Sequence, residues 1–159
     1  MEATHNTNLL ENFTAYIFND TIRRDPRLNI SVTTLTEFQK ILLYIEVTGK
    51  SDERRRDYDR MLFKGEIDSC KASKGIIGNF LTKLMIDTIS NYSNFRFTCP
   101  LEKKVFYVNS FPLPTEKDLP IFLIPLRGKF LCTVRLKVKL GKGKSLVPLI
   151  TLNVYGDHI

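Results

Sequence analysis

The stretch that decides the fold is Phe130–Leu140, with the sequence FLCTVRLKVKL. Apolar side chains alternate there with mostly polar or basic ones, and this period of two is typical of a β-strand with one buried face. The turn Gly141-Lys142-Gly143-Lys144 follows, and Leu146–Tyr155 is predicted to return as the partner strand. We expect the basic face to be solvated, where its lysines discourage edge pairing. The predicted buried face consists of Phe130, Cys132, Val134, Leu136, Val138 and Leu140.

The same alternation predicts further strands upstream. In the longest of them, Leu28, Ile30 and Val32 share one face. Many short strands separated by turns indicate a mostly β protein, an antiparallel β-sandwich or β-cup of about seven to nine strands. Its length of 159 residues fits a single domain, residues 1–159. The upstream strands are predicted at Phe13–Phe18, Leu28–Phe38, Lys40–Thr48, Met61–Ile67 and Lys103–Asn109.

One segment has the periodicity of a helix instead. Its apolar positions are spaced by three and four residues, which predicts one amphipathic helix over about residues 73–90. Ser73 is the expected N-cap, and Leu84 is expected on the buried stripe. The stripe consists of Ile77, Phe80, Leu81, Leu84, Met85, Thr88 and Ile89.

Phe111–Leu126 combines four prolines with eight large apolar side chains. Proline removes a backbone donor, so this segment cannot be a central strand throughout. Loops are normally polar and exposed. An apolar loop therefore either covers the core as a lid or contacts a ligand or a membrane, and the sequence leaves both open.

The sequence gives little support for catalysis or nucleic-acid binding. The two histidines, His5 and His158, lie near the chain ends, so the usual general base and zinc ligand are missing from the interior. We expect no enzyme activity, no metal and no cofactor. The net charge of +7 fits an anionic partner or plain solubility. Phe106 and Tyr107 are adjacent and point to opposite faces, unlike a base-stacking strand, so no nucleic-acid partner is expected.

The cysteines suggest a disulfide. Cys70, Cys99 and Cys132 are 29 and 33 residues apart, which matches no metal or redox spacing. Cys70 and Cys99 lie at element ends and are expected to pair. Cys132 lies inside a strand, on its apolar face, and is expected to stay reduced.

The compartment is inferred from glycosylation acceptors. Asn-x-Ser/Thr occurs at Asn12, Asn19, Asn29 and Asn91, which are candidate N-glycosylation sites. The N-terminus has neither the basic start nor the apolar core of a signal peptide. Together with the cysteines, the acceptors favour the mature form of a secreted glycoprotein.

An ordered pattern in the second half resembles a known family. Cys70 is followed by the helix, by Cys99-Pro100, by the Phe-Pro and Leu-Pro segment, and by Pro125-Leu126-Arg127-Gly128-Lys129-Phe130 with its alternating strand. The pattern covers roughly Asp68–Tyr155. It resembles the ganglioside-activator-like branch of the ML lipid-recognition proteins, and among them the insect chemosensory protein B group and related secreted fly domains of unknown function. The chain departs from the vertebrate activators in having three cysteines.

The resemblance implies a β-cup that opens onto a lipid-sized cavity. The expected function is that of a secreted, non-enzymatic binding protein for a lipid or other apolar small molecule, such as a chemosensory (pheromone) carrier or a lipid-presenting cofactor. A membrane surface or a receptor is a further expected partner. The alternative is a β-sandwich interaction module with a filled core, which docks a receptor through its Pro-rich loop.

The expected ligand-binding residues belong to the apolar cavity and its mouth. Basic residues at the rim, Lys103, Lys104, Arg127 and Lys129, are either selective for a polar head group or ordinary surface side chains. The expected cavity and mouth residues are Phe80, Leu84, Phe106, Phe111, Leu113, Leu119, Ile121, Phe122, Leu123, Ile124, Phe130, Val134 and Leu136.

Overall fold

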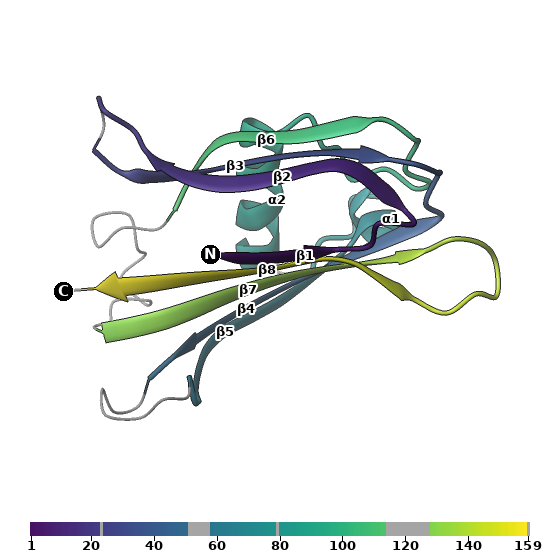
Figure 1. Cartoon of the computed structure of the whole chain (residues 1–159). Helices are drawn as coiled ribbons and strands as arrows, with labels where there is room; N and C mark the ends of the chain where they lie inside the picture. Colours follow the sequence, from purple (N-terminus) through teal and green to yellow (C-terminus); the bar gives the residue numbers. More distant parts are fainter. Residues whose placement is uncertain (23, 51–57, 79, 114–127, 159) are drawn as a thin grey trace.

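A computed structural model describes residues 1–22, 24–50, 58–78, 80–113 and 128–158. Two antiparallel sheets face each other (Figure 1). The larger sheet has the strand order β1 (Glu2–His5), β8 (Val147–His158), β7 (Gly128–Lys139), β4 (Lys40–Gly49) and β5 (Arg60–Asp68). The smaller sheet has the order β2 (Leu10–Asn19), β3 (Pro26–Thr34) and β6 (Val105–Pro112).

The predicted fold class, an antiparallel β-sandwich with a helix, is confirmed. The seven predicted strands correspond to β2 through β8. The strand that sequence reasoning missed is β1, whose residues Glu-Ala-Thr-His are all exposed and have no apolar alternation. It forms because β8 offers a free edge, along which Glu2 pairs with Asn153 and His5 with Ile150.

The alternation of Phe130–Leu140 places one row of side chains between the sheets. Within the larger sheet, Val134 of β7 lies opposite Ile45 of β4 and Leu152 of β8. Because side chains of paired residues point to the same face, all three project inward. The predicted inner face of this strand is therefore confirmed.

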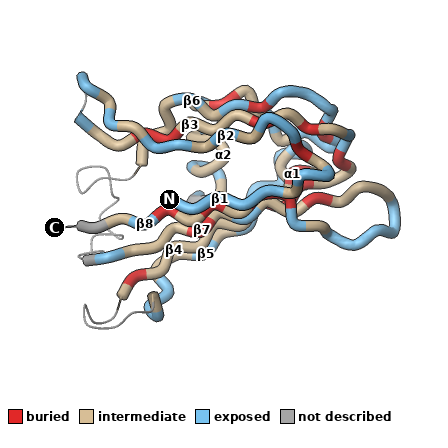
Figure 2. The backbone as a smooth tube through the Cα atoms, in the orientation of Figure 1, coloured by how far each residue is buried: buried red, intermediate tan, exposed pale blue. Residues whose placement is uncertain are grey.

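The two sheets come closest together at the end that carries α1 (Ser69–Ala72), which we call the packed end (Figures 1 and 2). Phe38 is fully buried there and exchanges backbone hydrogen bonds with Leu101, at 3.0 and 2.8 Å. Burial of large apolar side chains is the main favourable term in folding. The core cluster consists of Leu10, Val32, Phe38, Ile41, Leu101, Phe106, Val138, Leu149, Ile150 and Leu152.

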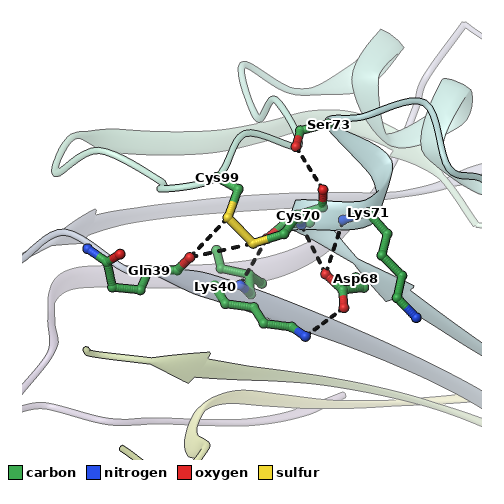
Figure 3. A network of polar contacts seen from close by, with 9 residues as sticks. Gln39, Lys40, Asp68, Cys70, Lys71, Ser73 and Cys99 are labelled. Carbon is green, nitrogen blue, oxygen red and sulfur yellow. Dashed lines mark hydrogen bonds and ion pairs between the residues drawn. A yellow bond between two sulfur atoms is a disulfide. The ribbon is translucent and has the colours of Figure 1, made fainter. Parts of the chain in front are cut away.

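The predicted disulfide is confirmed, and it lies at the packed end (Figure 3). Asp68 caps α1, because its Oδ1 accepts hydrogen bonds from the backbone N–H groups of Cys70 and Lys71 at 3.0 and 3.2 Å. Its Oδ2 is 2.6 Å from Nζ of Lys40. Burial raises the pKa of Asp68, but Lys40 and the two N–H groups outweigh this and hold that pKa below its ordinary value. The cap therefore joins β4, β5 and the Cys70–Cys99 bridge.

The predicted helix starts later than expected, and a separate one-turn helix precedes it. The prediction of a single helix from about residue 73 was wrong at its start, because Ser73 is the C-cap of α1 and the second helix, α2, spans Phe80–Tyr92. Gly75 has a φ of +72°, the left-handed conformation that commonly ends helices. The N–H groups of Gly75 and Ile76 donate to the carbonyls of Ala72 and Lys71. Neither α1 nor α2 is long and apolar enough to cross a membrane.

Removing the disulfide should lower the free energy of unfolding. For Cys70→Ser combined with Cys99→Ser we expect a loss of about 3 kcal/mol, since the bridge closes a separation of 29 residues. Urea denaturation measures the loss. Reductant should bring the wild type to the level of the double variant and leave that variant unchanged. Three free thiols in peptide mapping of native protein would contradict the bridge.

Candidate functional site

A cavity of about 200 Å³ lies between the sheets. The residues that line it are all aliphatic or aromatic, and its wall presents no polar surface. Since an apolar cavity of roughly 150 Å³ stays dry and binds benzene in another protein, this one is large enough for a small hydrocarbon group. The lining residues are Leu28, Ile30, Val32, Leu43, Ile45, Ile89, Phe95, Phe97, Phe106, Tyr107, Val108, Phe111, Val134, Leu136, Ile150 and Leu152.

Strand alternation positions most of the wall. From the smaller sheet, β3 contributes its inward row. From the larger sheet, Leu43 pairs with Leu136 and Ile45 with Val134. These pairs lie on one face, so the inner surfaces of both sheets are apolar where the cavity lies.

A side wall comes from α2 and the segment after it. Helix α2 contacts β5 of one sheet and β6 of the other (Figure 1), and its Ile89 lines the cavity. Met85 of α2 lies near Gly65 of β5, where a Cβ would be 3.5 Å from the Met85 sulfur, an ordinary contact distance, and 3.0 Å from the ring of Phe63. The helix therefore bridges the gap between the edge strands.

In the segment after α2, the side chain of Asn94 hydrogen-bonds to the backbone of the edge strand β6. Oδ1 of Asn94 accepts from the backbone N–H of Tyr107, and its Nδ2 donates to the carbonyl of Val105, both at 2.8 Å. Next to it, Phe95 contacts the rings of Phe97 and Phe106 at centroid distances of 4.9 and 5.6 Å. Such tilted and edge-on pairs add to the energy of apolar burial. Asn94 thus fixes an aromatic part of the cavity wall.

The predicted site residues are distributed as follows. Phe106, Phe111, Val134 and Leu136 line the cavity. Leu113 and Phe130 are described but lie outside its wall, and the Phe130 ring packs over Gly156. The remaining predicted mouth residues of the Pro-rich segment, Leu119, Ile121, Phe122, Leu123 and Ile124, and the rim residue Arg127, lie outside the described residues.

Two residues of α2 point away from the cavity. The side chain of Phe80 is 74% exposed and that of Leu84 is 43% exposed. The prediction that Leu84 lies on a buried stripe was wrong, because Leu84 shares the exposed face of α2 with Phe80, whereas Ile89 reaches the cavity. The wall instead contains residues that the sequence analysis did not assign to the cavity, above all Phe95 and Phe97.

The described wall of the site consists of aliphatic and aromatic residues, so the site is suited to binding apolar groups. Within the described ranges, His, Cys, Asp and Glu side chains form no group of three that could hold a metal ion. His5, one of the two histidines, stacks on Phe13 with a centroid distance of 4.6 Å.

The free thiol lies on the same strand face as the cavity wall. Cys132 is two residues from Val134 on β7 and pairs with Val47 and Val154. Burial raises the pKa of the Cys132 thiol to about 11.

At pH 8 we therefore expect about one thiol of Cys132 in a thousand to be ionised. Since the thiolate is the reactive form, labelling by iodoacetamide should be slow. Labelling should become fast in 6 M guanidinium, on the order of the rate of an ordinary cysteine; equal rates in the native and unfolded states would contradict this environment.

The four glycosylation acceptors differ in their surroundings. Asn12, Asn19 and Asn91 are exposed. Asn29 is half-buried; its Nδ2 donates to the hydroxyl of Tyr16 at 2.9 Å, and its Oδ1 accepts from the N–H of Ser110 at 2.7 Å. A sugar on Nδ2 would compete with the first of these bonds, so Asn29 has a structural role.

Asn29→Ala should therefore be destabilising. We expect a loss of about 1–3 kcal/mol in the free energy of unfolding, because the N–H of Ser110 loses its partner. Asn91→Ala is the matched control and should change it by less than about 0.5 kcal/mol. Equal melting temperatures of the two variants would contradict the structural role of Asn29.

The fold and the cavity define the class: a two-sheet β-sandwich with an apolar cavity that a helix borders. The chain belongs to the protein family of unknown function DUF1091, which matches residues 47–131. The matched region contains the disulfide, α2, the aromatic segment after it and β6. A comparison with curated proteins finds no match.

Proposed function

We propose that this protein is a non-enzymatic binding protein that takes up a lipid or another apolar small molecule between its two sheets. The observation that carries the proposal is the cavity of about 200 Å³ with a wholly apolar wall. Ligand sites are concave, mostly apolar and few per protein. A filled sandwich core would have interior side chains in this space instead.

The energetics favour a hydrocarbon part inside the cavity. A buried methylene contributes about 0.8 kcal/mol, so about six of them supply roughly 5 kcal/mol. A polar group inside would lose its hydrogen bonds to water, at a cost of about 1–3 kcal/mol or more, since the wall offers none in return. The expected ligand therefore places an acyl chain or a small ring system between the sheets and keeps any polar head outside.

We further propose that the protein works outside the cell. The disulfide supports this, because such bridges persist in oxidising compartments, and three exposed glycosylation acceptors are consistent with it. The narrower role of a pheromone carrier or lipid-presenting cofactor rests on the resemblance of the sequence pattern to the ML proteins.

A pair of substitutions on one strand tests the cavity. Val134→Phe adds volume at the cavity wall, so it should fill the space and weaken binding of the apolar fluorescent probe N-phenyl-1-naphthylamine at least tenfold, while the melting temperature is unchanged or raised. Val138→Phe is the matched control, because Val138 lies on the same face of β7 but is fully buried in the core at the packed end. It should lower the free energy of unfolding by about 1–3 kcal/mol through overpacking.

Probe binding and stability of the two variants also test the alternative, an interaction module with a filled core that docks a receptor. If the core is filled, Val134→Phe should destabilise as much as Val138→Phe, and the wild type should take up no probe. Either result would overturn the binding function proposed here.

A further inference from the structure

The segment that leads into α2 and the first turns of α2 carry large apolar side chains that are exposed in the described part of the chain. Ile76 is 60% exposed, and Phe80 and Leu84 are 74% and 43% exposed. Phe80 and Leu84 are four residues apart in the helix and lie on the same face. Single exposed apolar residues are ordinary, whereas a cluster of large ones marks an interaction site.

The same short stretch has positive charge and no negative charge. Lys71, Lys74 and Lys83 are exposed, and no ion pair joins any of them to another described residue. From Lys71 to Ile86 the sequence contains no Asp or Glu. Three lysines without an ion pair to another described residue therefore lie in the same short stretch of sequence as the exposed apolar side chains.

We propose that the exposed side chains of Lys71, Lys74, Ile76, Phe80, Lys83 and Leu84 form one surface that docks onto anionic lipid bilayers. Apolar side chains flanked by lysines at a helix are the pattern of interfacial membrane binding, in which apolar groups enter the acyl boundary and ammonium groups contact lipid phosphates. The lysine stems can lie along the apolar surface while their charges stay at the head groups. Protein–protein interface cores are depleted of lysine, so the composition favours a lipid surface over a protein partner.

The rest of the helix limits how deep the docking goes. Asp87 and Asn91 continue the outward face of Phe80 and Leu84 at helical spacing, and both are exposed. An acidic side chain is repelled by anionic lipid, and Asn91 is a glycosylation acceptor. Only the start of α2 therefore enters the interface, while its end stays in water.

Docking in this orientation brings the cavity wall close to the bilayer. Helix α2 carries Phe80 on the outer surface and Ile89 on the cavity wall. A ligand that leaves a membrane would then meet the protein at the helix that borders its binding site. The docking surface itself rests on exposure and charge, and it stands whether or not the cavity is filled by a lipid.

Vesicle flotation of the full chain tests the surface. The wild type should float with phosphatidylcholine vesicles that contain 30% phosphatidylserine in 0.1 M salt, and flotation should fall steeply at 0.5 M salt. A lysine near an anionic surface contributes about a factor of five, so Lys71→Gln with Lys74→Gln and Lys83→Gln should weaken binding about 100-fold. Phe80→Ser with Leu84→Ser should weaken it at least tenfold, with an unchanged melting temperature because both side chains are exposed.

A charge-matched control separates this surface from general basicity. Arg60→Gln with Lys142→Gln and Lys144→Gln removes three exposed basic side chains elsewhere and should reduce binding less than threefold. Equal losses in the two triple variants, or a wild type that does not float, would overturn the proposal. Uptake of N-phenyl-1-naphthylamine without vesicles should be the same in Phe80→Ser, Leu84→Ser protein as in the wild type, so a failure of the cavity function and a failure of docking give different results.

Discussion

The structure depends on one constraint: the inner faces of both sheets are apolar along most of their length, but close packing is concentrated at the packed end. There Phe38, Leu101 and Val138 fill the space between the sheets, and the Cys70–Cys99 bridge and the Asp68 cap hold the surrounding segments. Further along the strands the same alternation continues without enough side-chain volume to fill the gap. The cavity follows from this mismatch, and α2 closes its side by contacting β5 and β6.

The strands could be predicted because their signal is local. Val134, Leu136 and Val138 are recognised as one face from eleven consecutive residues, and the structure places them as expected. The start of α2 could not be predicted from spacing alone, because the left-handed Gly75 ends α1 after one turn. Periodicity identifies which residues share a face of a helix, but it does not identify what covers that face. Leu84 shows the difference, since it belongs to the apolar stripe and yet is largely exposed.

Only part of the cavity wall could be predicted, because a local sequence pattern does not show how far apart the two sheets lie. Phe106, Phe111, Val134 and Leu136 were identified as apolar and near the expected opening, and they line the space. Whether facing apolar rows are filled or separated depends on contacts between residues far apart in sequence, such as Phe38 with Leu101. Phe95 reaches the wall because the Asn94 side chain hydrogen-bonds the edge of β6. A single side chain such as Asn94 that hydrogen-bonds to a strand edge leaves no periodic signal in the sequence.

The two apolar regions of the protein differ in a way that bears on the proposed functions. The inner region presents no polar surface, so what it can hold is decided by shape and by the area removed from water. The outer region at the entry to α2 shares its stretch of sequence with three exposed lysines, so the partner we propose there combines an apolar interior with a negatively charged surface. An anionic bilayer has this combination, and it is also a source of acyl chains. Both regions draw on α2, a helix within the span that matches the DUF1091 family. Phe80 is on its outer surface and Ile89 is on the cavity wall, so substitutions in this one helix bear on both proposed functions.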